Sequence, residues 1–294
     1  MRITVASGKG GTGKTLVATS LALVASDLGR AALLDADVEA PNAGLFLHPT
    51  IEHTEVVAQL VPQVDQAICN HCGRCAQVCQ YHAIASLPTT TLVFHELCHG
   101  CGSCALNCPT AAIREVPRPM GVIEAGQAEG LAFAQGILQI GEAMATPVIR
   151  ALKRYAEHRG WDGAESLILD APPGTACPVI EALRGADVAL LVTEPTPFGL
   201  HDLALAVEIA RDVLHLPIAV VINKDGGGDS GVEDFCRTND LPVLLRLPLR
   251  REIAAAYSMG APLVKALPAY REAFRQLLEA LNTMVSTPRS MENA

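Results

Sequence analysis

A glycine-rich segment near the start of the chain constrains the fold more than any other feature. It spans Gly8 to Thr15, follows a short apolar stretch over residues 3–6, and precedes an Ala- and Leu-rich stretch with helical spacing over residues 15–28. A second apolar stretch covers residues 31–34. A strand, a helix and a second strand within about 30 residues form a βαβ unit, which implies two parallel strands joined by a right-handed crossover.

The glycine-rich segment itself fits the phosphate-binding pattern G-x-x-x-x-G-K-[ST]. In such a loop, consecutive backbone N–H groups turn towards phosphate oxygens, and the N-terminus of the following helix adds a favourable dipole. Lys14 is predicted to reach the β- and γ-phosphates of a nucleotide, and the Thr15 hydroxyl to ligate Mg²⁺. A chance glycine-rich turn is the alternative, but both the spacing and the flanking elements favour a nucleotide site.

Cysteines form the second distinctive feature, because eight of the ten lie between residues 69 and 108. They form two copies of C-x₂-C-x₂-C-x₃-C, and the second copy follows the first by 29 residues. Ala83-Ile84 recurs at the same offset as Ala112-Ile113. Repetition of residues outside the motif indicates a repeated structural unit as well as a repeated metal site.

This cysteine spacing is typical of bacterial ferredoxins, in which three close thiolates bind one [4Fe–4S] cluster and the fourth binds the other cluster. Zinc is the alternative, but tetrahedral zinc favours two C-x₂-C pairs per site. One residue departs from the ferredoxin pattern: Pro109 follows Cys108, whereas Gln80 follows Cys79. The predicted ligands are Cys69, Cys72, Cys75 and Cys108 for the first cluster, and Cys79, Cys98, Cys101 and Cys104 for the second.

The segment from Lys9 to Thr15 resembles the deviant phosphate loop of MinD/ParA-family ATPases. The resemblance implies that Lys9 reaches the ATP of a second subunit across a dimer interface; a solvated loop lysine is the alternative. It further implies that Asp35, at the end of the second strand, contacts the Mg²⁺ shell, and that Asp37 orients the attacking water.

Two later segments carry the same resemblance. Residues 167–174, Leu-Ile-Leu-Asp-Ala-Pro-Pro-Gly, are similar to the family's second switch, with Asp170 delivering a carboxylate to the metal. Asn223, after an apolar strand, is similar to the position that contacts adenine. The predicted catalytic residues are Lys9, Lys14 and Asp37, and the predicted Mg²⁺ ligands are Thr15, Asp35 and Asp170. The predicted nucleotide-binding residues are Gly8, Lys9, Gly10, Gly11, Thr12, Gly13, Lys14, Thr15 and Asn223.

The remaining chain predicts a doubly wound α/β sheet, because apolar strands alternate with helical stretches. We expect a mostly parallel, MinD-like P-loop domain over residues 1–65 and 118–294, interrupted by an α+β ferredoxin-like domain over residues 66–117. We expect the last ten residues to be frayed. The expected helices cover residues 140–158 and 269–284, and the expected strands cover residues 167–169, 188–192, 218–222 and 243–247.

Charge and hydropathy exclude several classes of protein. The net charge of −9 argues against nucleic acid or an anionic membrane as the main partner. No apolar run approaches the ~20 residues that cross a bilayer. The C-terminal helix has only Arg271 and Arg275 as basic residues, too few for MinD-like membrane attachment. The first residues do not resemble a signal peptide, so a cytoplasmic location is expected.

Two cysteines remain outside the repeats. Cys177 lies seven residues after Asp170, and the nitrogenase iron protein, a distant relative by resemblance, places a cluster ligand at the same distance from its second-switch aspartate. That protein uses two such cysteines per subunit. Cys236, in a later helix-like stretch, is not an obvious second ligand, so Cys177 is expected to be a small buried core residue.

Together, these motifs resemble the ferredoxin-containing branch of MinD-superfamily ATPases, which is related to Mrp-type iron–sulfur carriers. The resemblance implies an ATP-dependent homodimer, a Mg²⁺-dependent ATPase activity, and ATP, Mg²⁺ and two [4Fe–4S] clusters as cofactors. It implies a protein partner in redox or metal-cofactor biology, with electron transfer and cofactor assembly both open. A MinD-like positioning or cell-division ATPase, with structural or sensing clusters, is the competing class. Residues 56–64 are the expected connector to the insert, and their apolar content predicts packing.

Overall fold

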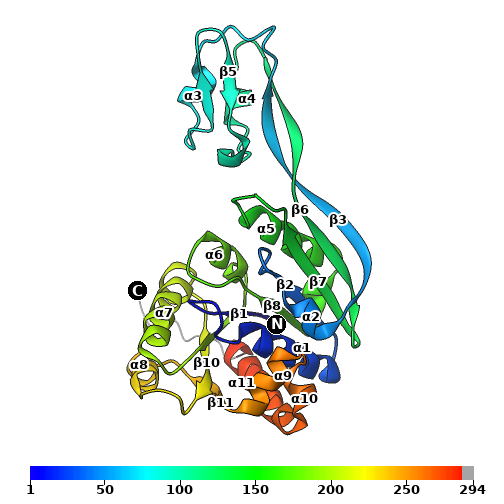
Figure 1. Ribbon diagram of the computed structural model, residues 1–294, viewed down its shortest axis with the longest axis vertical. Coiled ribbons are helices and arrows are strands. Elements are labelled where there is room, and N and C mark those ends of the chain that lie inside the picture. The colour runs from blue at the N-terminus through cyan, green and yellow to red at the C-terminus, as the bar shows by residue number, and fades with distance from the viewer. Residues whose placement is uncertain (287–294) are drawn as a thin grey trace.

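The computed structural model describes residues 1–286, which form an α/β body and a long arm that carries a small domain at its end (Figure 1). The strands are β1 (Arg2–Ala6), β2 (Ala31–Asp35), β3 (Thr50–Val64), β4 (Ile84–Ser86), β5 (Thr91–Val93), β6 (Ile113–Ala128), β7 (Leu131–Leu138), β8 (Ser166–Asp170), β9 (Val188–Thr193), β10 (Ile218–Asp225) and β11 (Val243–Pro248). The α-helices are α1 (Lys14–Leu28), α2 (Ala43–Leu47), α3 (Arg74–Gln77), α4 (Ser103–Leu106), α5 (Thr146–His158), α6 (Cys177–Leu183), α7 (Pro197–Glu208), α8 (Gly231–Thr238), α9 (Arg251–Ser258), α10 (Leu263–Ala266) and α11 (Arg271–Ser286).

One nine-stranded sheet organises the body, in the order β11-β10-β9-β1-β8-β2-β7-β6-β3. The strands from β11 to β7 pair in parallel, whereas β6 and β3 are antiparallel at one edge. The chain therefore winds outwards from β1 in both directions, which confirms the predicted mostly parallel α/β sheet.

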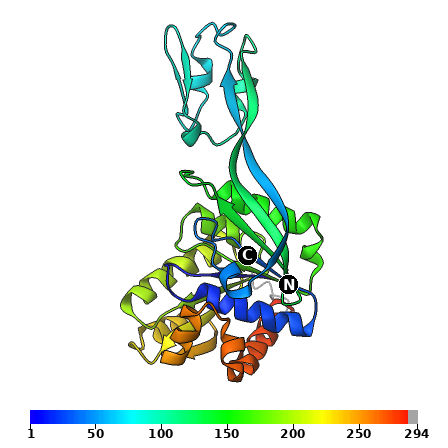
Figure 2. The same ribbon diagram turned by 45° about the vertical axis from the view of Figure 1, so that its right-hand side comes forward.

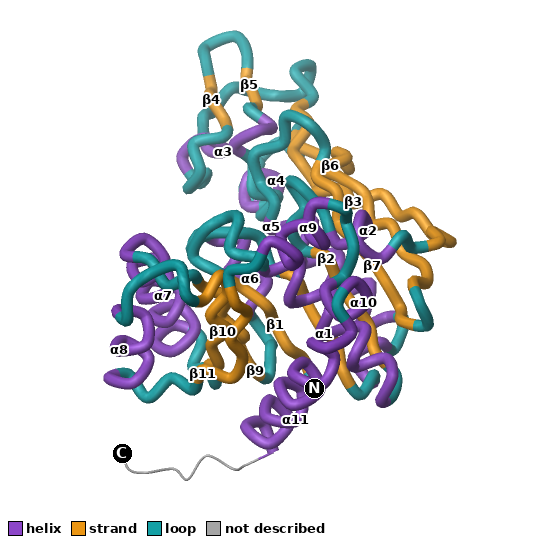
Figure 3. Tube along the Cα trace, turned by 60° about the horizontal axis from the view of Figure 1, so that its bottom comes forward, coloured by secondary structure: helices purple, strands orange, loops and turns teal. Residues whose placement is uncertain are grey.

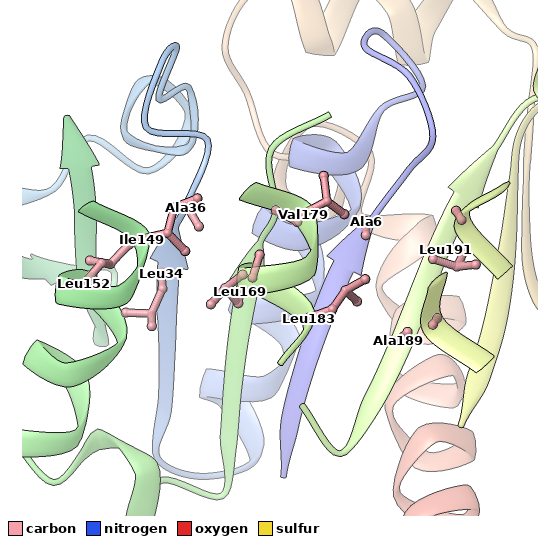
Figure 4. Close-up of a cluster of buried hydrophobic side chains, with 14 of the residues drawn as sticks. Ala6, Leu34, Ala36, Ile149, Leu152, Leu169, Val179, Leu183, Ala189 and Leu191 are labelled. Atoms are coloured by element: carbon pink, nitrogen blue, oxygen red, sulfur yellow. The ribbon is translucent and has the colours of Figure 1, made fainter. Parts of the chain in front are cut away.

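Successive strand residues point to opposite faces of the sheet, and helices cover both faces. Leu34 and Leu169 point towards α5 and α6, beside Ile149 and Leu152 (Figure 4). The other face packs against α1, which lies beside α11 (Figure 3). Since both faces are covered, β2 and β8 are buried along their whole length. Within residues 1–286, no helix is both long and apolar enough to span a membrane.

The arm is a continuation of the sheet edge. β3 and β6 pair from Thr50–Gln127 to Val64–Ile113, whereas β7 pairs with β6 only as far as Gly121. Beyond that point the two strands form a twisted ribbon that leaves the body (Figures 1 and 2). The expectation of a packed connector over residues 56–64 is confirmed in part: Val57 packs into the core of the body and Val61 packs against Ala83 and Cys98 of the small domain, whereas Val56 is 61% exposed. The hydrogen-bond ladder with β6 orders the rest of this strand.

Other elements predicted from the sequence agree with the structure only in part. It missed the strands over residues 113–138, and the predicted domain boundary after residue 117 falls within β6. The helix expected from residue 140 begins at Thr146, because Pro147 occupies its first turn and residues 139–145 form a loop. The last helix is α11, which includes Val285 and Ser286; the other eight residues expected to fray lie outside the described residues.

Replacement of a core leucine on α5 should test the packing of this layer. Leu152 is fully buried, so Leu152→Ala should lower the free energy of unfolding by about 2–5 kcal/mol through lost burial and a cavity. Leu28→Ala, at a helical position that is 55% exposed, is the matched control and should change it by only about 0.5 kcal/mol. Urea unfolding of both variants provides the measurement, and equal losses would contradict the assigned core.

Candidate functional site

The phosphate loop lies at the centre of the sheet, between the end of β1 and the start of α1. Gly11 and Gly13 have φ angles of +78° and +92°, a region that glycine adopts without strain. A Cβ atom at Gly13 would also lie 2.3 Å from Asn223 Nδ2, so the loop has no room for a side chain there. Lys14 is buried as the first residue of α1, and its charge acts on the nearby carboxylates of Asp37 and Asp170.

Two buried carboxylates lie beside this loop. Asp35 and Asp170 end the neighbouring strands β2 and β8, in which they are direct register partners. The Thr15 hydroxyl donates to Asp170 Oδ2 at 2.6 Å, whereas Asp170 Oδ1 is buried and has no hydrogen-bond partner among residues 1–286. An unsatisfied carboxylate oxygen next to a threonine hydroxyl fits a divalent cation that prefers oxygen ligands. The three predicted Mg²⁺ ligands, Thr15, Asp35 and Asp170, are thus brought together.

Asp35 also organises the segment that follows β2. Its carboxylate accepts hydrogen bonds from the backbone N–H groups of Asp37, Asn42 and Ala43, at 3.1, 2.9 and 2.8 Å. The loop containing Asp37 is therefore tied to a residue of the predicted metal site. Movement of Asp35 would be felt directly by Asp37, the residue predicted to orient water.

Burial governs the protonation of all three carboxylates. It raises the pKa of Asp170 to about 7, and it raises the pKa of Asp35 well above its ordinary value, with the Asp170 charge adding to the rise. Burial also raises the pKa of Asp37, against the opposing effect of Lys14. The site concentrates negative charge with one buried lysine to offset it, so a divalent cation would favour the charged forms.

A glutamate that sequence reasoning missed joins two lysines of the site. Glu194 lies 3.4 Å from Lys9 Nζ and 2.5 Å from Lys224 Nζ, through its two carboxylate oxygens. Lys224 also donates to the Gly11 carbonyl at 3.1 Å. Lys9 is thus ion-paired within its own chain, and its predicted contact with a second subunit stays a prediction. The signal was present in the sequence, because Glu194 directly follows strand β9 at the same sheet edge.

Asn223 lies at the far side of the loop, where its side-chain amide donates to the Thr12 carbonyl at 2.7 Å. It borders a pocket formed with Leu249, Ile253 and Tyr257, next to the phosphate loop. Apolar and aromatic walls beside an amide suit a planar base. The pocket residues were not predicted, because they come from the loop after β11 and from α9, which carry no motif.

The eight repeated cysteines line two separate cavities in the domain at the end of the arm. Each cavity draws three cysteines from one repeat and the fourth from the other, as the spacing predicts. One cavity, hereafter site 1, is lined by Cys69, Cys72, Cys75 and Cys108; the other, site 2, by Cys79, Cys98, Cys101 and Cys104. That these cysteines bind clusters stays a prediction.

The arrangement of the sulfur atoms bears on the kind of metal. Within residues 1–286, no three His, Cys, Asp or Glu side chains are close enough to share a single metal ion. The four cysteines of each site instead line a cavity. Backbone N–H groups of Ala83 and Ala112 donate to Cys79 and Cys108 sulfur at 3.3 and 3.2 Å, an environment that stabilises thiolate ligands.

The two remaining cysteines lie in the body. Cys177 begins α6 and is exposed, so the expectation of a buried core residue is wrong. Proline at the next position starts the helix at the surface, which leaves the thiol outside the core. Cys236 is buried in α8, and burial raises the pKa of its thiol to about 11. Cys236 is therefore a neutral packing residue.

Comparison with known proteins agrees with this geometry. The family model described as the CobQ/CobB/MinD/ParA nucleotide-binding domain matches residues 3–263. An uncharacterized protein of Methanocaldococcus jannaschii is 36% identical over 227 residues, which cover 77% of this chain and 79% of that protein. An iron-sulfur cluster carrier protein of Pyrococcus horikoshii is 24% identical, covering 95% of this chain and 85% of the carrier. The structure of septum site-determining protein MinD with Mg-ADP, also from Pyrococcus horikoshii, shares the fold with a TM-score of 0.58, 18% identity and 97% coverage of both chains.

The raised pKa of Asp170 predicts a pH-dependent stability in the absence of Mg²⁺ and nucleotide. A carboxyl whose pKa rises from 3.8 to about 7 on folding favours the folded state at low pH, and this contribution is lost as the pH rises through 7. Asp170→Asn should therefore raise the free energy of unfolding by about 2 kcal/mol or more at pH 8 and by less at pH 5. Asp240→Asn, which removes an exposed carboxylate, should not reproduce this pH dependence in urea unfolding. A gain that is the same at both pH values would contradict the assignment.

Proposed function

This chain belongs to the CobQ/CobB/MinD/ParA family of nucleotide-binding domains, and on that basis we propose that it is a Mg²⁺-dependent ATPase that carries two [4Fe–4S] clusters. The single observation that carries the proposal is the pair of four-cysteine cavities on an arm continuous with the nucleotide-binding sheet. Such a chain combines a nucleotide switch with two redox centres. The iron-sulfur cluster carrier protein among its relatives supports a role in iron–sulfur chemistry.

In the proposed ATPase, the loop N–H groups and Lys14 bind the phosphates, and Asn223 and its pocket hold the adenine. Thr15, Asp35 and Asp170 would hold Mg²⁺, which supplies charge neutralisation on the phosphates. Asp37 would orient the attacking water and accept its hydrogen bond. Its place beside Lys14 and after Asp35 supports this role, since both neighbours are fixed by phosphate and metal binding.

Lys9 is proposed to change partners when ATP binds. In one arrangement it pairs with Glu194 of its own chain at 3.4 Å; in the other it would contact the ATP of a second subunit. The ion pair is partly exposed and therefore weak, so negatively charged phosphate can compete for the lysine. This exchange gives an ATP-dependent dimer in which each active site is completed in trans, as an arginine finger does.

We further propose that the two clusters remain bound and transfer electrons to a protein partner. Cys75, Cys98 and Cys104 are buried, and each site takes ligands from both repeats, so release of a cluster would require the small domain to open. These features favour resident clusters over delivery.

Contacts at the root of the arm support coupling between nucleotide and clusters. Val38, the residue after Asp37, is hydrogen-bonded to the end of β7. The residue after β7 is hydrogen-bonded to β6. β6 in turn pairs with β3, which is hydrogen-bonded to a cysteine of site 2. A contiguous set of packed and bonded groups can transmit two discrete positions. In order, the contacts are Leu138 N to Val38 O at 2.8 Å, Gln139 N to Met120 O at 2.8 Å, Arg118 to Glu142 at 2.6 Å, the Gln59–Arg118 strand pair, and Gln59 Nε2 to Cys98 O at 2.6 Å.

Metal analysis tests the cluster assignment directly. Protein purified without oxygen should contain about eight iron atoms and eight acid-labile sulfides per chain. Cys69→Ser and Cys98→Ser, at matching positions of the two repeats, should each lower both numbers towards four, while Cys177→Ser serves as a control that leaves them unchanged. Zinc without labile sulfide would contradict the assignment, and transfer of iron to an acceptor protein would favour delivery.

Three substitutions test the ATPase and the dimer. Lys14→Ala should weaken ATP binding, since the buried positive charge is lost. Asp37→Ala should bind ATP but hydrolyse it at least 100-fold more slowly, on the order expected for loss of one positioning group, and should accumulate as a dimer in sedimentation. Adding Lys9→Ala should remove that dimer, whereas adding Lys265→Ala, a surface lysine paired with Glu129, should not. An unchanged dimer in the Lys9 variant would point to another interface.

A further inference from the structure

The two cysteine sites are built by repeats with nearly the same backbone. Gly73 and Gly102, which are 29 residues apart, have φ angles of +76° and +74° and precede α3 and α4. His82 and Ala111, at the same offset, have φ angles of +52° and +54°. Because the backbones match, differences between the two sites come from the side chains at matching positions.

The most consequential difference lies opposite these glycines. A Cβ atom at Gly73 would lie 3.9 Å from Ser86 Cβ, whereas one at Gly102 would lie 3.5 Å from both carboxylate oxygens of Glu115. Ser86 and Glu115 are themselves 29 residues apart, so they occupy the same place in the two repeats. Site 1 therefore has a neutral hydroxyl where site 2 has a negative charge.

Glu115 is positioned to act on site 2. Its strand partner Pro62 and its neighbour Gly102 both line that cavity. Within the described part of the chain, Glu115 has no ion-pair partner to neutralise it. A negative charge disfavours the addition of an electron, so it lowers the reduction potential of a nearby cluster.

Hydroxyl groups near the sulfur atoms also favour a higher reduction potential at site 1 than at site 2. At site 1, the Thr91 and Thr110 hydroxyls lie 3.6 and 3.7 Å from the sulfur atoms of Cys69 and Cys108. At site 2, the backbone N–H groups of Ala83 and Gly100 donate to the sulfur atoms of Cys79 and Cys98 at 3.3 and 3.4 Å. Polar contacts to sulfur raise a cluster's potential, and site 1 has more of the hydroxyl contacts.

We propose that the two sites hold clusters of unequal reduction potential, and that Glu115 makes the cluster at site 2 the lower-potential one. This inference rests on the proposed binding of two clusters. Pro62 lines site 2, and the Gln59 side chain donates a hydrogen bond to the Cys98 carbonyl of that site. Site 1 is lined by Val64 and Ile113, at the end of the ribbon. A single electron therefore rests on the cluster at site 1, and the cluster at site 2 is the harder one to reduce.

The experiment is a redox titration of the cluster-loaded protein, followed by electron paramagnetic resonance. The unmodified protein should give two midpoint potentials. In Glu115→Gln, the lower midpoint should shift to a more positive potential while the higher one stays. In Ser86→Glu, which places a carboxylate at the matching position of site 1, the higher midpoint should shift to a more negative potential. The double variant Ser86→Glu/Glu115→Ser should narrow or reverse the difference.

Glu55→Gln is the matched control, because it removes an exposed carboxylate from the same ribbon but seven residues before Pro62, or roughly 23 Å along the strand. It should move neither midpoint, since that distance exceeds the screening length. Equal midpoints in the unmodified protein, or a Glu115→Gln variant that shifts both or neither, would overturn the inference. Iron and sulfide analysis of the same sample separates the two failures: a sample without clusters overturns the proposed function as well, whereas a fully loaded sample with indifferent potentials overturns this inference alone.

Discussion

Parallel pairing of β1, β8 and β2 is the constraint on which the rest of the molecule depends. Parallel strands in register bring their carboxyl ends to the same edge, so the phosphate loop after β1, Asp170 after β8 and Asp35 after β2 meet there. The hydrogen bond from Thr15 to Asp170 joins the start of α1 to the end of β8, although the two residues are 155 positions apart in the sequence. Two buried carboxylates side by side are costly without a cation, and the fold accepts that cost at the place where nucleotide and metal would bind.

The edge of the same sheet holds the small domain in place. A small cysteine-rich domain attached by a flexible linker would move independently of the body. Here the linker is replaced by two paired strands of the nine-stranded sheet, and the inner part of β6 also pairs with β7. The ribbon thus has the order of a β-ladder despite exposing apolar residues such as Val56 and Leu60. Val57 and Val61 of the same strand are buried, so pairing and packing together hold the small domain in position.

The internal repeat explains how one short domain can hold two centres with different properties. Closely matching backbones give two similar cavities, while each matched pair of side chains can change independently. Ser86 and Glu115 are such a pair, and they differ by a full charge. Charge differences of this kind need no change in fold, so they can give two redox centres different reduction potentials on the same backbone.

The sequence alone determined the phosphate loop, the parallel α/β class and the grouping of cysteines into two sets, because each depends on local spacing that only one kind of structure accommodates. Tertiary structure decided the rest. The pairing of β3 with β6 joins residues 50–64 to residues 113–128 and is carried by backbone hydrogen bonds, which leave little trace in side-chain pattern. The Lys9–Glu194–Lys224 cluster and the pocket beside Asn223 likewise join strand ends distant in sequence. The exposure of Cys177 follows from where α6 begins, and the charge beside site 2 follows from the approach of Glu115 to Gly102, a contact that the fold brings about within the second repeat.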